Sequence, residues 1–447
     1  MRPFAWTWGL LICWSFRSAA IAQVAGGLTL EEAVRRALQV HPQVQAARAR
    51  SGAAQAAGAE VGARRLPQFA LSATATRFEE PMIVAPLHGF DIRNPPIFDR
   101  TLIQGSVNLS YTLFDGGARR GRVRAARAEA ERARWEESAA EGGLIAEVAR
   151  RYLEVLTASG IWDARREGVG ALAAESVRVE RALGEGRAAR VQLLQVSAAL
   201  AQARAEEVAA AGRLEVARNE LARAIGLASW SEELGSLREV RMREAVLPDV
   251  EQLRRRARES NPDLVAAARR VEAARGLRAA ALAQWLPQVD VVGGYLGFGS
   301  GQGDFVAEWQ FGARLSYPLF AGGARAAAVR RAGYEVAAAE AIRGAVEQEL
   351  MGALDRAVAA YREAEARVAA GTTAVAHFEE LKRIEQLRLE TGAGTELDFL
   401  RAEADLRRAQ AALLEARHAL LLSRIELARL TGELDAGWLA EHLEEVR

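Results

Sequence analysis

Two stretches of this chain repeat one another and predict a duplicated fold. The sequence LFDGGARRGRVRAARAEAE begins at Leu113, and LFAGGARAAAVRRAGYEVAAAE begins at Leu319. Each of them follows a run of alternating apolar residues and opens a proline-free segment rich in Ala, Arg and Glu. Such self-similarity predicts two copies of one structural unit in a single chain.

Helix start and stop signals occur in the same order in both copies. A capping-box pattern is followed by an X-Pro pair that restarts a helix with proline at its first position, and a Leu-Pro-Gln triplet ends that helix. The spacing of the copies differs only between Pro67 and Tyr111, where prolines in the first copy predict a longer loop. The signals are Thr29-x-x-Glu32, His41-Pro42 and Leu66-Pro67-Gln68, then Asp249-x-x-Gln252, Asn261-Pro262 and Leu286-Pro287-Gln288.

Two strands are predicted after these helices in each copy. Apolar residues alternate with polar ones from Ile103 to Leu113 and from Trp309 to Leu319, which is the period of a strand and not of a helix. Each run follows another strand of similar length, at 68–78 and 288–298. Strands of about ten to twelve residues cross a bilayer when they are tilted. We therefore expect Val107, Leu109, Leu315 and Tyr317 to face lipid, and Ser106, Asn108, Arg314 and Ser316 to face a lumen.

Very long helices are predicted after the strands. No proline occurs between Ile97 and Leu247 or after Pro318. A helix from Gly117 to Leu183 would extend about 100 Å. Apolar residues recur in it at heptad-like steps, which predicts a seam for helix packing. The glycine pairs Gly116-Gly117 and Gly322-Gly323 supply the backbone freedom for the change of direction from strand to helix. The seam residues are Leu144, Val148, Tyr152 and Val155, matched by Leu350, Leu354, Val358 and Tyr361.

The N-terminus predicts export. Residues 1–22 have the pattern of a secretory signal peptide, so the mature chain would begin near Gln23. The single cysteine, Cys13, lies in that segment, and no later stretch is apolar enough for a spanning helix. The product is therefore either a soluble exported protein or one that crosses a membrane as strands. Four strands cannot close a barrel, so the second case requires several chains.

Charge argues against a nucleic-acid partner. The formal net charge is +1, and only Lys382 among 59 basic residues is a lysine. The arginines alternate with Glu at helical spacing, as in RAARAEAERARWEE, which predicts solvated helix faces with i to i+4 ion pairs.

The duplicated order of strands, Phe-x-Gly-Gly turn and long hairpin resembles the TolC family of outer-membrane channel-tunnel proteins. The resemblance extends from LTLEEAVRRALQVHPQV to LARLTG. It implies a mixed α and β membrane protein: a homotrimer with a twelve-stranded outer-membrane β-barrel and a periplasmic α-barrel of helical hairpins. The corresponding division of the chain is a first repeat at 23–230, an equatorial linker at 231–248, a second repeat at 249–432 and a C-terminal tail at 433–447.

The same resemblance implies the function. The chain would be the outer-membrane exit duct of a tripartite efflux pump or a type I secretion system. Its partners would be outer-membrane lipid, a periplasmic adaptor and, through that adaptor, an inner-membrane transporter. Neither a cofactor nor a bound metal is implied, and the cargo would be chosen by the transporter.

The resemblance also locates a periplasmic gate at the second hairpin tip. The family pattern there has two aspartates, and this chain has Asp398 at the first of these positions but Arg401 at the second. A ring of Asp398 side chains would attract cations, and Arg401 would partly cancel its field. The alternative is a solvated i to i+3 ion pair. The hairpin tips would dock the adaptor, although glycine at a turn needs no partner to explain it. The tip residues are Gly184, Gly186, Gly392, Gly394 and Thr395.

Two other classes of protein fit the sequence less well. An enzyme is disfavoured because the one lysine permits no Walker loop, and the five histidines form no His-x-x-x-His pair. His377 and Glu380 lie on one helix face, which is more typical of an exposed surface than of a metal site. A soluble periplasmic coiled-coil scaffold or adaptor would explain the long helices but not four strands of bilayer length.

Overall fold

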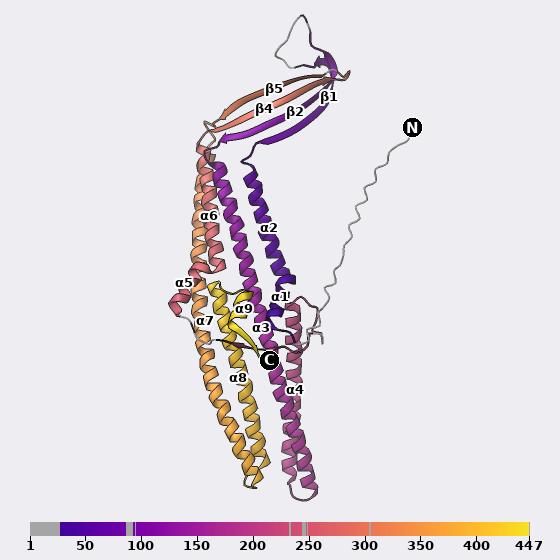
Figure 1. Cartoon of the computed structure of the whole chain (residues 1–447), viewed down its shortest axis with the longest axis vertical. Helices are drawn as coiled ribbons and strands as arrows, with labels where there is room; N and C mark the ends of the chain where they lie inside the picture. Colours follow the sequence, from indigo (N-terminus) through magenta and orange to yellow (C-terminus); the bar gives the residue numbers. More distant parts are fainter. Residues whose placement is uncertain are drawn as a thin grey trace, which may run out of the picture.

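The molecule is long and narrow, with a curved sheet at one end and helices running away from it (Figure 1). The computed structural model describes residues 27–85, 93, 95–231, 234–243, 247, 249–303 and 305–446. The predicted signal peptide, parts of the long loop before Phe98 and parts of the predicted linker lie outside the described residues. Among the described residues, no helix combines the length and apolar character that a membrane span requires.

The element order of the first copy recurs in the second. The first comprises α1 (Leu30–Val40), α2 (Pro42–Ala63), β1 (Gln68–Ile83), β2 (Phe98–Phe114), α3 (Ala118–Gly184) and α4 (Arg190–Ala224). The second comprises α5 (Val250–Ser260), α6 (Pro262–Leu282), a 3₁₀ turn η2 (Ala283–Trp285), β4 (Gln288–Ser300), β5 (Phe305–Ser316), α7 (Ala324–Glu390) and α8 (Glu396–Thr431). Both α3 and α7 have 67 residues, in agreement with the long helices expected from the sequence.

Side chains cap the short helices as the sequence predicts. The Thr29 hydroxyl accepts a hydrogen bond from the Glu32 backbone N–H at 3.1 Å, and the Glu32 carboxylate accepts one from the Thr29 N–H at 3.3 Å. At the start of α5 the Asp249 carboxylate accepts from the Gln252 N–H at 3.1 Å. These bonds satisfy backbone donors that a helix N-terminus leaves free.

Paired glycines make both turns from strand to helix. Gly116 and Gly117 have φ of 63° and 91°, and Gly322 and Gly323 have φ of 56° and 80°. These values lie in the left-handed region that other residues rarely adopt, so both turns use the conformational freedom of glycine. A Cβ on Gly116 would also lie 2.8 Å from the carbonyl oxygen of Ala283.

The four long strands form one antiparallel sheet in the order β1-β2-β4-β5. Its register aligns Leu71, Val107, Tyr295 and Trp309 in one row across the strands. The two copies thus join through β2 and β4. The outer edges of β1 and β5 have no strand partner within the part of the chain that the structure describes.

The fourth strand does not have the predicted limits. It begins at Phe305 and ends at Ser316, so Tyr317 and Leu319 lie beyond it. Pro318 explains the early end, because proline has no N–H to donate to a sheet and restricts the residue before it. The expectation that Tyr317 belongs to the strand is therefore wrong.

A small second sheet lies at the middle of the molecule. β3 (Glu239–Met242) pairs antiparallel with β6 (Leu443–Val446), which follows α9 (Ala436–His442). These elements fall within the segments predicted as linker and tail. Trp438 and Leu439 of α9 are buried. The sequence did not indicate the two strands, because four residues are too few to display a period.

Two cores lie where the short helices meet the long ones. In the first, α1, α3, α8 and α9 enclose the seam residues of α3; in the second, α5, α7 and α8 enclose those of α7. All eight predicted seam residues are buried. The Tyr152 hydroxyl lies 2.8 Å from the carbonyl oxygens of both Leu28 and Arg238, so it ties the N-terminal segment and the linker to α3.

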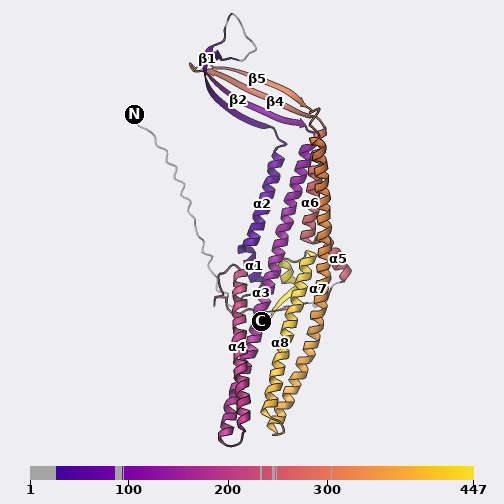
Figure 2. The ribbon, with the colours of Figure 1, turned by 180° about the vertical axis from the view of Figure 1, so that it is seen from behind.

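The helices form a single curved layer. On the sheet side of the cores the contacts run α2, α3, α6, α7, and on the far side they run α4, α3, α8, α7 (Figures 1 and 2). α2, α4 and α7 are therefore the borders of this layer, below the two free edges of the sheet.

The helices α3 and α6 approach each other closely at two glycines. A Cβ on Gly121 would lie 2.7 Å from the Gly276 carbonyl oxygen, and a Cβ on Gly276 would lie 2.8 Å from the Ala125 backbone nitrogen. Backbone atoms cannot move aside as a flexible side chain can. This contact joins the two copies just below the sheet.

The substitution Gly276→Ala tests this contact, with Gly143→Ala as its control. Both glycines are inside helices, and a Cβ on Gly143 would meet nothing within 4 Å. We expect Gly143→Ala to stabilise the protein by up to about 1 kcal/mol through helix propensity. Gly276→Ala should destabilise it by about 1 to 3 kcal/mol through overpacking. Urea unfolding followed by circular dichroism measures both, and equal stability of the two variants would contradict the close contact.

Candidate functional site

One face of the four-stranded sheet is apolar and uncovered. Outside the register shifts after Arg77 and Thr112, the register places odd-numbered residues of all four strands on the same face. Leu71 and Trp309 on this face are 81% and 76% exposed, more than soluble proteins normally allow for side chains of this size in a continuous patch. The other exposed members are Phe69, Ile103, Val107, Tyr295, Phe305, Phe311 and Leu315.

The opposite face carries hydrogen-bonded polar side chains. The Ser72 and Ser106 hydroxyls lie 2.7 Å apart, and Asn108 donates to the Ser106 hydroxyl at 2.8 Å. Thr112 donates to the Asp290 carboxylate across β2 and β4 at 2.7 Å. The sheet thus has two chemically different faces, one fit for lipid and one fit for water.

Most of the predicted strand residues lie on the expected faces. Val107, Leu109 and Leu315 are on the apolar face, and Tyr317 lies in the turn after β5. The Arg325 guanidinium lies 5.7 Å from the centre of the Tyr317 ring. The predicted lumen residues, Ser106, Asn108, Arg314 and Ser316, are all on the polar face.

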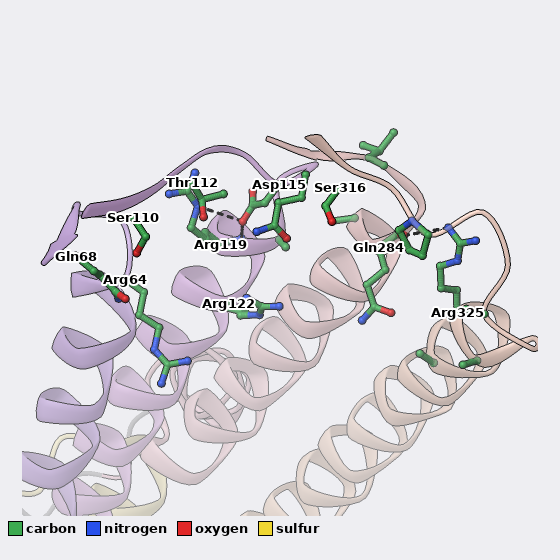
Figure 3. A pocket seen from close by; sticks show the side chains of 18 of the residues that line it. Arg64, Gln68, Ser110, Thr112, Asp115, Arg119, Arg122, Gln284, Ser316 and Arg325 are labelled. Atoms are coloured by element: carbon green, nitrogen blue, oxygen red, sulfur yellow. Dashed lines mark hydrogen bonds and ion pairs between the residues drawn. The ribbon is translucent and has the colours of Figure 1, made fainter. Parts of the chain in front are cut away.

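A concave surface that encloses a volume of about 930 Å³ lies where the polar face meets the helices (Figure 3). Four arginines line it: Arg64 from the end of α2, Arg119 and Arg122 from α3, and Arg325 from α7. Asp115 is the only carboxylate in the lining. No local sequence pattern reveals this cluster, because its members come from three helices that are far apart in the chain.

The arginine of the strand-to-helix turn has different hydrogen-bond partners in the two copies. In the first copy Asp115 accepts hydrogen bonds from the Arg119 backbone N–H at 2.8 Å and from its Nε at 3.2 Å. In the second copy Ala321 takes the place of Asp115. Arg325 instead lies 3.5 Å and 3.3 Å from the carbonyl oxygens of Gln284 and Leu319, and its guanidinium stacks over the Trp285 ring at 4.8 Å.

The two hairpin tips have the same backbone geometry. Gly186 and Gly392 have φ of 68° and 72°, and each follows the end of its helix. The next residue donates its N–H back to the helix, from Arg187 to the Ala182 carbonyl at 2.7 Å and from Ala393 to the Arg388 carbonyl at 2.8 Å. This is the Schellman motif, for which glycine is the preferred residue.

The other tip glycines differ in how strongly the turn requires them. A Cβ on Gly394 would lie 2.9 Å from the Arg388 Cβ, so the turn itself accounts for this glycine. Gly184 has neither a positive φ nor a neighbour within 4 Å of a Cβ. Of the four predicted tip glycines, Gly184 alone has no conformational reason within the described chain.

Asp398 takes part in the helix cap of the second tip. Thr395 is the N-cap of α8: its hydroxyl accepts from the Asp398 backbone N–H at 3.2 Å and donates to the Asp398 carboxylate at 2.6 Å. The Arg401 guanidinium is 4.0 Å from the other carboxylate oxygen, and its side chain is 69% exposed. An acidic residue is also favoured here by the helix dipole. The side chains of Glu396 and Leu397 lie outside the described residues.

The first tip replaces this arrangement with a neutral one. The Gln192 amide oxygen accepts a hydrogen bond from the Ala189 backbone N–H at 3.0 Å. At these two positions the second tip therefore carries the charged residues Asp398 and Arg401, and the first tip carries the uncharged residues Gln192 and Gln195. Within the described residues, no group of His, Cys, Asp and Glu could hold a metal ion.

A buried histidine joins the two hairpins near the middle of the molecule. His418 of α8 is 5% exposed, and its Nδ1 lies 2.6 Å from the hydroxyl of Thr157 in α3. That hydroxyl donates to the Leu153 carbonyl at 2.8 Å, so it accepts from Nδ1–H of a neutral ring. The pKa of His418 is lowered from 6.5 to about 4, mainly by burial; the charge of Glu239 opposes this shift and that of Arg417 contributes to it.

The family of the chain follows from a family-wide sequence comparison. The model of the outer membrane efflux protein family matches residues 33–227 and 253–433. The chain belongs to this family, and the resemblance to TolC-like channel-tunnels is thereby confirmed. It is an outer-membrane protein of the efflux class. No individually curated protein matches the chain in sequence.

Solved structures share its fold. CusC, described in connection with transmembrane channel formation, is 18% identical, with a TM-score of 0.74, 90% of this chain covered and 92% of CusC. The outer membrane protein VceC from Vibrio cholerae is 23% identical, with a TM-score of 0.71 and coverages of 90% and 96%. The MtrE outer membrane channel from Neisseria gonorrhoeae is 20% identical, with a TM-score of 0.72 and coverages of 90% and 88%.

The buried histidine predicts a loss of stability in acid. The pKa of His418 is lower in the folded chain than the ordinary value of 6.5, so between pH 6.5 and about 4 the unfolded chain binds more protons. Stability should fall as the pH decreases through that window, by up to about 1.4 kcal/mol per pH unit. His418→Leu should remove this part of the slope.

Thermal unfolding of the detergent-extracted protein between pH 7 and pH 4.5 measures the effect. His377→Leu is the control, since it removes an exposed histidine of α7 by the same substitution. An equally steep loss of stability in His418→Leu and in the wild type would contradict the assignment.

Proposed function

We propose that three copies of this chain form the outer-membrane exit duct of an efflux pump or secretion system. Each chain would contribute four strands to a twelve-stranded barrel and its helices to a periplasmic tunnel. The single observation that carries the proposal is an exposed apolar sheet face bounded by two unpaired strand edges, β1 and β5.

Those edges require further strands. Unpaired backbone N–H and C=O groups cost several kcal/mol each in the hydrocarbon layer, so a sheet that lies in lipid must close. Pairing of β5 from one chain with β1 from the next, repeated around an axis, satisfies every edge. The number three comes from the family resemblance, because strand chemistry alone also permits other closed rings.

The borders of the helical layer support the same assembly. Leu194 and Val208 of α4 are 61% and 72% exposed, and Tyr334 of α7 is 77% exposed. A neighbouring chain that adds its α4 beside α7 would cover these side chains. Other apolar residues on the same borders are Val191, Val216, Ile342, Leu381, Ile384 and Leu387.

The direction of the duct follows from the same arrangement. In each copy, the helix before the first strand and the helix after the second strand lie at the same end of the sheet (Figure 1). We assign this end to the periplasm. The connection between Ile83 and Phe98 would then be external. The hairpin tips lie at the far end of the molecule from the sheet (Figure 1), where they could meet a periplasmic adaptor and, through it, an inner-membrane transporter. Gly184, which the turn does not require, is the best candidate for such a docking contact.

The periplasmic gate belongs to the second tip. Asp398 and Arg401 lie in the first turns of α8 and are partly exposed, as residues that line a narrow opening must be. The bond from Thr395 to Asp398 provides a structural reason for the aspartate as well. We therefore assign Asp398 two roles, a helix cap and a part of the charged ring.

Extraction and electrical recording test the proposed function together. The protein should appear in the outer-membrane fraction, migrate as a heat-modifiable trimer and form channels in planar bilayers. A soluble periplasmic scaffold or adaptor, the alternative class, would remain in the periplasmic fraction and give no conductance.

The faces of the sheet can be tested with two neighbouring substitutions. Leu109→Arg places a charge on the apolar face and should cost about 2 to 4 kcal/mol near mid-bilayer. Asn108→Arg is the matched control on the polar face of the same strand. The amount of heat-modifiable trimer should fall in the first variant only. Equal loss in both, or in neither, would contradict the assignment of the faces.

The gate can be tested with charge changes at two positions. In a trimer Asp398→Asn removes a ring of negative charges, and conductance and cation preference should fall together because charges in a narrow, partly desolvated ring interact strongly. Arg401→Asp should do the opposite and increase block by multivalent cations, which carboxylates bind. Thr395→Ala removes the cap hydrogen bonds but keeps the charge of Asp398, so it separates the effect of the charge from the loss of the cap. Unchanged conductance, selectivity and block in assembled variants would show that these residues do not line the constriction.

A further inference from the structure

The arginines that line the concave surface beneath the sheet carry more positive charge than the nearby carboxylates neutralise. Arg64 is paired with Glu60 at 3.3 Å, and Arg119 is paired with Asp115 at 3.2 Å. For Arg122 and Arg325 no carboxylate partner occurs among the described residues. Two guanidinium groups per chain are therefore without a counter-charge in the part of the chain that the structure describes.

Of the two arginines, Arg325 gives the stronger evidence that a counter-charge is missing. It is 9% exposed, and a charge buried to this degree is costly unless an opposite charge accompanies it. Its main-chain partners and the ring of Trp285 satisfy part of the guanidinium. The equivalent Arg119 has a carboxylate in contact, and the second copy has Ala321 at the position of that carboxylate.

The surroundings of the arginines are those of a water-filled passage. Gln68, Ser110, Thr112, Gln288 and Ser316 of the four strands line the same surface, and all are on the polar face of the sheet. Asp290 lies one row further into the sheet, where it faces Arg314 across β4 and β5 and accepts from Thr112. Its charge is thus compensated within the sheet.

We propose that this arginine-lined surface binds oxyanions, namely the carboxylate, phosphate or sulfonate groups of solutes in the lumen. The planar guanidinium group matches such groups with two parallel hydrogen bonds, and rings of Arg are one means by which pores favour anions. In the proposed trimer the surface repeats three times around the axis at the base of the barrel. The duct would then attract anions at this level, whatever the charge at the periplasmic tips.

The inference rests on the proposed function, because the polar face becomes a lumen only in the closed assembly. Its test is therefore made on assembled channels. Absence of channels in the wild type would contradict the proposed function, whereas channels that bind no oxyanion would contradict this inference alone.

Inorganic phosphate is the probe. In planar bilayers of phosphatidylcholine, phosphate added at constant ionic strength should reduce the chloride conductance of the wild type. Arg122→Gln should raise the half-blocking phosphate concentration about tenfold, the change expected on loss of one charge-assisted hydrogen bond. It should also lower the chloride to potassium permeability ratio. Arg325→Gln should have the same effects, and since Arg122 is exposed, its variant keeps the test valid if the turn at Arg325 tolerates no change.

Arg330→Gln is the matched control. Arg330 is an exposed arginine of α7, the helix that contains Arg325. It follows the lining residue Ala328 by two positions and therefore lies about 200° from it around the helix axis. Its substitution removes the same charge close to the site and should leave phosphate block unchanged.

Three results would overturn the inference. Equal block in the wild type and in both lining variants would mean that carboxylates of the adjoining chain already occupy the guanidinium groups. Equal weakening in Arg330→Gln would mean that only the overall charge matters. Block that disappears when phosphatidylglycerol is included in the bilayer would assign the surface to a lipid headgroup and not to a solute.

Discussion

The structure depends on one constraint: a sheet with an exposed apolar face must not leave its strand edges open in lipid. Within the residues that the structure describes, a single chain supplies four strands and leaves β1 and β5 with free outer edges. Lipid offers no hydrogen bonds to those edges, and the proposed assembly closes them with strands of neighbouring copies. The helical layer has the same property, since its borders α2, α4 and α7 lie below the edges of the sheet and α4 and α7 carry exposed apolar side chains. The sheet and the helical layer therefore leave unpartnered surface along the same two sides, which the proposed assembly would cover.

Duplication gives this long molecule two cores of similar construction. Each copy seats a short helix against the middle of a 67-residue helix, and the two cores so formed hold the layer at its centre. Close contact between Gly121 and Gly276 then joins the copies near the sheet, and His418 joins the hairpins below. The copies differ where function is expected: the second has Ala321 in place of Asp115 and the Asp398 cap in place of Gln192. The carboxylate of the strand-to-helix turn thus occurs only in the first copy, and that of the helix cap at the tip only in the second.

Much of this architecture could be predicted from local signals. Alternation identified the strands, capping patterns such as that of Thr29 identified the helix starts, and paired glycines identified the turns, because each of these signals acts over a few neighbouring residues. The failures have the same origin. Pro318 ended a strand that alternation alone would have continued to Leu319, and the four-residue strands β3 and β6 were too short to show a pattern. The arginine cluster was invisible because its members lie on α2, α3 and α7.

The sequence by itself determined the order of the repeated helices and strands, the length of the long helix α3 and the apolar side of the second strand in each copy. It also carried the resemblance to the efflux family. Period, caps and breakers are local properties of the chain. Only the tertiary structure decided that β2 pairs with β4, that Arg325 is buried without the carboxylate that its counterpart has, and that Asp398 is bonded to Thr395. These facts depend on contacts between segments distant in the chain or on the exact direction of side chains. No period in the sequence encodes such contacts; the close packing of the folded chain selects them.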